Sequence, residues 1–117
     1  MDAQSDPTLD EEVIEDLRDF MEDEFGDLIQ KFIEDTNIRI SQISEAIDKT
    51  NTDEMKKAAH ALKSSSGNIG AIKLSCFAEE FERLGFEDSI GNALDLINQA
   101  RKEFSEVKKI LSTEFQS

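Results

Sequence analysis

The sequence of 117 residues has no tryptophan or tyrosine, and it has only one cysteine, one histidine and one proline. A single cysteine excludes an intramolecular disulfide framework. One cysteine and one histidine are also too few for the usual zinc sites, which take about four such ligands. No apolar run approaches the roughly 20 residues of a membrane-spanning helix, and the acidic N-terminus is unlike a signal peptide. We therefore expect one small cytoplasmic domain without a metal site or a membrane anchor of its own.

Basic residues are scarce as well. The chain has 13 Lys and Arg against 27 Asp and Glu, which gives a net charge of −14. This excess disfavours binding to nucleic acids or anionic membranes, because phosphate contacts need a basic face. The charge is uneven, however: residues 1–27 hold 12 of the acids, while residues 55–78 hold none. We call residues 55–78 the basic island, since its charged residues are Lys56, Lys57, Lys63 and Lys73.

Apolar residues recur at spacings of three and four along most of the chain, and this pattern predicts helices. It predicts a flexible lead-in at 1–8, a short helix from about residue 10, and longer helices at about 22–49, 53–67, 71–85 and 90–111. Because the connections are short, neighbouring helices should run antiparallel. The expected fold is all-α: an antiparallel up-and-down four-helix bundle with an additional short N-terminal helix, forming one domain at 9–117.

The same spacing assigns the expected core. It places Phe20 on the buried face of the short helix and Leu94 on the buried face of the last helix. Gly85 is expected to stop the fourth helix, because glycine commonly follows the last helical residue. The core stripe of the third helix consists of Met55, Ala59, Leu62, Ser66 and Ile69.

The single histidine, His60, lies in the basic island. The centre of the core stripe of its helix is about 140° away, so the imidazole should be exposed. Lys56, Lys63 and Gly67 share its face of the helix at positions i−4, i+3 and i+7. Ammonium groups there could pair with a phosphoryl dianion on the ring, and the small residues Ser64 and Gly67 would let a partner protein approach. These features favour a phosphoryl acceptor over a surface histidine without a function.

The run from His60 to Ala71, with the sequence HALKSSSGNIGA, resembles the signature of histidine-containing phosphotransfer (HPt) domains. That signature is His-x-Leu-Lys-Gly, two small residues and an ending of an apolar residue, Gly and Ala. The pair Phe81-Glu82 also falls where the family has Leu-Glu on the following helix. The similarity covers essentially the whole chain, and it implies a four-helix bundle with the phosphorylated histidine exposed on the second bundle helix.

The resemblance implies a phosphorelay intermediate, free-standing and of the bacterial type. His60 would accept a phosphoryl group from an aspartyl phosphate on one receiver domain and pass it to another, and Lys63 would stabilise its charge. Lys56, Ser64 and Gly67 would contact the partner, although the family usually has glycine where this chain has Ser64. The partners would be receiver domains of hybrid sensor kinases and response regulators.

The resemblance also bears on cofactors and on assembly. The receiver would supply the divalent metal, so the chain itself needs no cofactor. No glycine-rich phosphate loop of the Walker or kinase type is present, so we expect a phosphocarrier without its own ATP site. A bundle that closes its own core and carries a net charge of −14 should be a monomer.

Two alternatives remain open from the sequence. The acidic residues 1–27 would also suit a non-phosphorylated helical adaptor that sequesters a protein partner. Gly67 could either end its helix with a positive φ or keep a docking surface flat. A thiol dyad of Cys76 and His60 is disfavoured, because Cys76 lies off the core stripe of its helix. We expect Cys76 to be a partly packed structural thiol.

Overall fold

Helices make up almost all of the described part of the chain. The computed structural model describes residues 7–116, with side chains for residues 7–112. No strand occurs within this range. The elements are α1 (Glu11–Met21), a 3₁₀ turn η2 (Glu22–Glu24), α2 (Phe25–Asp48), α3 (Thr52–Asn68), α4 (Ile72–Phe86) and α5 (Ala93–Gln116).

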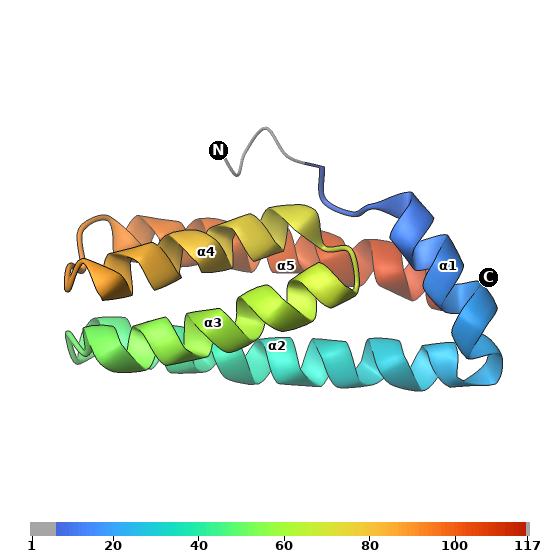
Figure 1. The fold of residues 1–117 in the computed structure, drawn as a ribbon, viewed down its shortest axis with the longest axis horizontal. Coiled ribbons are helices and arrows are strands. Elements are labelled where there is room, and N and C mark those ends of the chain that lie inside the picture. Colours follow the sequence, from blue (N-terminus) through green and yellow to red (C-terminus); the bar gives the residue numbers. More distant parts are fainter. Residues whose placement is uncertain (1–6, 117) are drawn as a thin grey trace.

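The helices α2 to α5 form an up-and-down bundle (Figure 1). Each helix packs on the next one in the chain. The last helix, α5, also packs on α2 and so closes the bundle. The helices α2 and α4 lie diagonally opposite, because they share no contact. The short helix α1 crosses one end of the bundle, beside the turn between α3 and α4 (Figure 1). This arrangement confirms the predicted all-α four-helix bundle with an additional N-terminal helix.

Polar side chains cap the starts of two helices. The Asp10 carboxylate accepts hydrogen bonds from the backbone N–H groups of Glu12 at 3.1 Å and Val13 at 3.4 Å. Asn51 does the same at the start of α3, where its side-chain oxygen lies 3.1 Å from the N–H of Glu54. Such caps satisfy N–H groups that have no partner inside the helix.

The turn between α3 and α4 is held by backbone hydrogen bonds on both sides. Gly70 has a φ of 82°, which glycine adopts without steric cost. Its carbonyl accepts from the N–H of Asp10, and the N–H of Lys73 donates to the carbonyl of Pro7. The segment before α1 is therefore attached to this turn. Residues 1–6 of the predicted lead-in lie outside the described residues.

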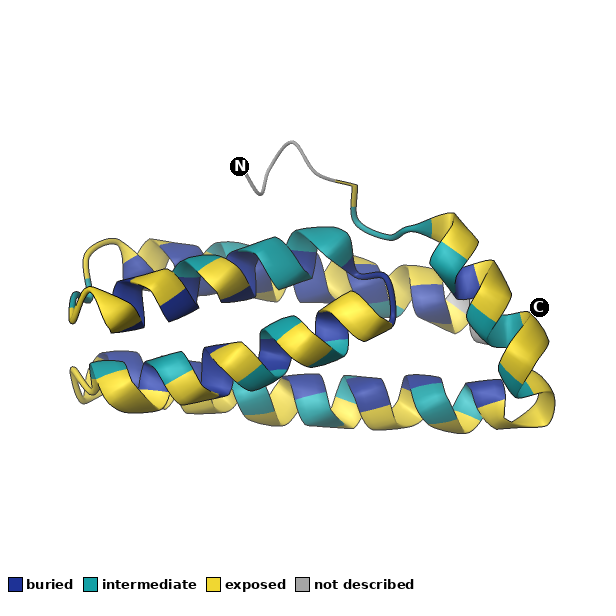
Figure 2. Ribbon diagram, viewed as in Figure 1, coloured by how far each residue is buried: buried dark blue, intermediate teal, exposed yellow. Residues whose placement is uncertain are grey.

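The buried residues line the inside of the bundle, as Figure 2 shows in dark blue. The predicted core stripe of α3 is buried throughout. The prediction was wrong for Phe20, which is 84% exposed, and for Leu94, which is 63% exposed. Phe20 is six residues after the buried Ile14, so it points about 120° away around α1. Leu94 lies about 100° from the centre of the buried stripe of α5. The preceding residue, Ala93, lies on this stripe and is buried instead.

Gly85 does not stop α4, contrary to the prediction. The helix continues to Phe86, and Gly85 is buried against the first turns of α3. A Cβ atom at Gly85 would lie 2.5 Å from the Cβ of Lys56 and 3.0 Å from the carbonyl oxygen of Thr52. Glycine is needed here because the backbones of α3 and α4 approach each other closely.

Replacing Gly85 with alanine should therefore destabilise the fold. Overpacking of this kind costs about 1–3 kcal/mol, which outweighs the gain of up to about 1 kcal/mol in helix propensity. Gly67→Ala is the matched control, because a Cβ there meets only the Ser75 Oγ, at 3.8 Å. The control should leave the free energy of unfolding unchanged or raise it. Urea unfolding of both variants measures this, and equal shifts would contradict the packing explanation.

Candidate functional site

The candidate site lies along the line where α3 and α4 face each other, which we call the α3–α4 seam. Lys56, His60 and Lys63 come from α3, at intervals of one helical turn. Glu82 and Phe86 come from α4 and are also one turn apart. The two helices run antiparallel, so Phe86 meets Lys56 at one end of this set while Glu82 meets His60 and Lys63.

The imidazole of His60 is exposed and is held on one edge. Its side chain is 70% exposed, which confirms the exposure predicted from the helical phase. Its Nδ1 lies 2.6 Å from the Oε2 of Glu82. The ring is thus fixed at Nδ1 while the rest of it faces solvent.

Glu82 links His60 to Lys63. Its side chain is only 12% exposed, and its Oε1 accepts a hydrogen bond from the Nζ of Lys63 at 2.6 Å. The bond from Lys63 lowers the pKa of Glu82 below its ordinary value, and the contact with His60 adds to this against the opposing effect of burial. The bond to Glu82 in turn raises the pKa of Lys63. Glu82 is therefore a buried carboxylate that stays charged at neutral pH.

A charged carboxylate decides which nitrogen of a neutral imidazole carries the proton. A carboxylate can only accept, so the short contact requires a proton on the Nδ1 of His60. The lone pair of the neutral ring is then on Nε2, the nitrogen away from Glu82. This assignment follows from the hydrogen-bond partner. The arrangement leaves an oriented nucleophilic nitrogen open to solvent.

The other predicted site residues line the same face. The ammonium of Lys56 is over the Phe86 ring, 4.7 Å from its centroid, and 3.8 Å from the Asp53 carboxylate. Ser64 and Gly67 are exposed on α3. The backbone of Gly67 lies inside α3, and the positive φ after this helix belongs to Gly70. The structure therefore excludes the alternative in which Gly67 ends the helix.

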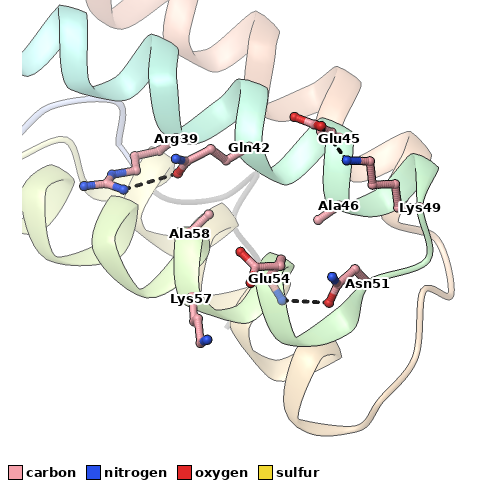
Figure 3. Close-up of a pocket in the computed structure, with 9 residues that line it drawn as sticks. All are labelled: Arg39, Gln42, Glu45, Ala46, Lys49, Asn51, Glu54, Lys57 and Ala58. Carbon is pink, nitrogen blue, oxygen red and sulfur yellow. Dashed lines mark hydrogen bonds and ion pairs between the residues drawn. The ribbon is translucent and has the colours of Figure 1, made fainter.

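Two further features fall outside this site. Cys76 is partly buried and packs against the core, as predicted for a structural thiol. A polar groove of about 550 Å³ lies between α2 and α3 (Figure 3). Its basic groups already contact acidic or amide groups of their own helices: Arg39 contacts Asp35 and Gln42, Lys49 contacts Glu45, and Lys57 contacts Asp53. Every basic side chain that lines this groove is therefore already in contact with an acidic side chain.

In the described part of the chain, no three His, Cys, Asp or Glu side chains are placed to hold a metal ion together. None of its helices is both long enough and apolar enough to cross a membrane.

Glu82→Gln should weaken the fold in a way that depends on pH. The pKa of Glu82 is lowered in the folded state, so its charge stabilises the fold at neutral pH and this contribution is lost as the pH falls through the folded-state pKa. At pH 7 we expect a loss on the order of 1 kcal/mol, the scale of a charge-assisted hydrogen bond. The loss should shrink on acidification.

Urea unfolding of the wild type and the variant, from pH 7 down towards pH 3, measures this difference. Glu80→Gln is the control, because it removes an equal charge from α4 at a residue other than the one that bonds His60 and Lys63. A loss in Glu82→Gln that stays constant with pH would show that the charge of Glu82 contributes nothing.

The model of the Hpt domain family matches residues 27–110. Histidine-containing phosphotransfer protein B (HptB) from Pseudomonas aeruginosa is 30% identical, with a TM-score of 0.91 over 96% of this chain and 97% of that chain. No curated protein sequence gives a significant match.

Two plant structures share the fold at lower identity. A histidine-containing phosphotransfer protein from maize is 21% identical, with a TM-score of 0.82 over 93% of this chain and 90% of that chain. A protein from rice described as a histidine-containing phosphotransfer protein is 22% identical, with a TM-score of 0.81 over 93% and 82%. The family model spans well over half of the chain, and the HptB structure matches nearly all of it. The chain therefore belongs to the Hpt domain family, whose members are phosphocarriers of phosphorelays.

Proposed function

We propose that His60 accepts a phosphoryl group from the aspartyl phosphate of one receiver domain and transfers it to the aspartate of another. The observation that carries this proposal is the contact between the exposed imidazole and the buried, charged Glu82. This contact orients the ring and assigns its lone pair to Nε2. The family membership supports the same reaction.

The proposed transfer can be written as one displacement at phosphorus. The Nε2 lone pair of His60 forms a bond to phosphorus, and the bond from phosphorus to the aspartate oxygen breaks with its electron pair on the carboxylate. The ring then carries a positive charge that is shared with its Nδ1–H. The Oε2 of Glu82 lies 2.6 Å from Nδ1, so the negative charge of Glu82 stabilises the phosphorylated ring. The reverse displacement passes the group to the second receiver.

Lys63 has two roles in this proposal. In the unphosphorylated chain its ammonium neutralises part of the Glu82 charge. Once His60 carries a phosphoryl group, a rotation of the Lys63 side chain brings the same ammonium towards the phosphoryl oxygens. The side chain is 35% exposed, so part of it already lies against solvent.

The partner supplies the rest of the chemistry. Phosphoryl transfer needs in-line geometry and charge neutralisation rather than covalent machinery. We assign the divalent metal and the acidic pocket to the receiver domain, and the nucleophile, its orientation and a cation to this chain. On this assignment the chain needs no nucleotide site of its own. The exposed Ser64 and Gly67 give a receiver close access to the His60 side of α3.

His60→Gln should abolish phosphoryl acceptance while changing the free energy of unfolding by no more than about 1 kcal/mol, since one exposed side chain and one hydrogen bond are altered. The test incubates wild type and variant with the phosphorylated receiver domains of the source organism. The wild type should gain an acid-labile, base-stable label, and the variant should gain none. An unlabelled wild type would favour the acidic adaptor, and a labelled variant would place the acceptor elsewhere.

Gly67→Gln should weaken receiver binding without destabilising the fold. Gly67 is exposed inside α3, so a long side chain there projects from the His60 side of the helix. Helix propensity changes by at most about 1 kcal/mol and in favour of the variant. Titration calorimetry with a receiver that labels His60 should show at least a 10-fold weaker affinity, the scale of a substitution within an interface. Unchanged affinity would remove Gly67 from the docking surface.

A further inference from the structure

Phe86 is a large apolar side chain that the fold leaves exposed. It is 71% exposed, although it sits at the end of a helix whose other phenylalanines, Phe77 and Phe81, are buried. It lies four residues after Glu82, so the two share one side of α4. The exposed ring is therefore about one helical turn from the contact between Glu82 and His60.

Several contacts hold this end of α4 against α3. The ammonium of Lys56 lies 4.7 Å from the centroid of the Phe86 ring, a cation–π distance. The buried Gly85 lets the two backbones approach each other. The hydroxyl of Thr52 also donates a hydrogen bond to the carboxylate of Asp88, just beyond α4. These contacts hold the Phe86 ring in place, so less side-chain entropy would be lost when a partner binds it.

The surface around Phe86 is continuous with the candidate site. A groove of about 480 Å³ lies along α4, and Glu82 and Phe86 line it together with Cys76, Arg83 and the further acidic residues Glu79, Glu80 and Glu87. On the α3 side of the seam, the charged residues next to His60 are Lys56 and Lys63. A protein that reaches His60 therefore meets an aromatic ring that has a basic edge on its α3 side and acidic residues on its α4 side.

We propose that Phe86 is an apolar anchor for the receiver domain that docks on His60, with Lys56 pairing an acidic group at the rim of the same receiver. This inference rests on the proposed phosphotransfer at His60. Exposed aromatic side chains near the centre of an interface commonly supply much of its affinity. The acidic pocket of the receiver is complementary in charge to the α3 side of the seam. A second copy of this chain fits less well, because each copy has a net charge of −14.

Phe86→Ala tests the anchor, and Ile38→Ala is its matched control. Ile38 is an apolar side chain that is 54% exposed, and it lies on α2, diagonally opposite α4. For Phe86→Ala, the dissociation constant of a receiver domain that labels wild-type His60 should rise at least 10-fold, the scale of an interface hot spot. The KM for transfer should rise in parallel, while the rate at saturating receiver stays close to that of the wild type. Ile38→Ala should match the wild type in both measurements.

Labelling with phosphoramidate separates docking from chemistry. This small donor needs no docking surface, so it should label His60 equally in the wild type and in both variants. Circular dichroism melts check that both variants fold. A wild type that neither phosphoramidate nor any receiver labels would overturn the proposed phosphotransfer and the anchor with it.

Other outcomes would overturn the anchor alone. One is a labelled wild type with the same receiver affinity in Phe86→Ala and Ile38→Ala. Another is reduced phosphoramidate labelling in Phe86→Ala, which would show that Phe86 acts on His60 itself. A third is a wild-type dimer in sedimentation that Phe86→Ala dissociates while receiver affinity is unchanged, since the occupant would then be a second copy.

Discussion

The arrangement of the candidate site depends on the position of one carboxylate. Glu82 is almost fully buried between α3 and α4, and a buried charge is costly unless it is paired and hydrogen-bonded. His60 and Lys63 supply these partners from α3, at 2.6 Å each. The same interactions therefore satisfy the carboxylate, orient the imidazole and keep an ammonium nearby. Stability and orientation cannot be separated at this point of the molecule.

The bundle around this carboxylate explains why α3 and α4 come so close. Gly85 has no side chain at the position where a Cβ atom would collide with Lys56, and Ala59 and Ala78 are small core residues on the two helices. The helices α2 and α5 complete the core from the other side without contributing to the seam. Large buried side chains come from all four helices, for example Ile43, Leu62, Phe81 and Leu111. The α3–α4 pair therefore supplies part of the core as well as the face that carries the chemistry.

Much of the fold and of the candidate site was predictable from the sequence, and the misses have different causes. Spacing within one helix predicted the bundle, the core stripe of α3 and the exposure of His60. It could not predict that Glu82 contacts His60 or that Phe86 contacts Lys56, because such pairs depend on how two helices align. Two signals pointed to Glu82: it follows the core residues Leu74 and Ala78 in an i+4 series, and the pair Phe81-Glu82 falls where the HPt pattern has Leu-Glu. Gly85 was misassigned because glycine serves both helix ends and close helix packing.

All residues of the candidate site lie close together in the sequence, and this has a consequence for folding. Every residue of the seam, from Lys56 to Phe86, belongs to a single helical hairpin whose connecting turn is short. Contacts between residues close in sequence require little loop-closure entropy and form quickly. The groups that surround His60 can therefore assemble without waiting for the more distant pairing of α2 with α5, which closes the bundle. The geometry around His60 is therefore set by contacts within one helical hairpin, whereas the stability of the domain depends on all four helices of the bundle.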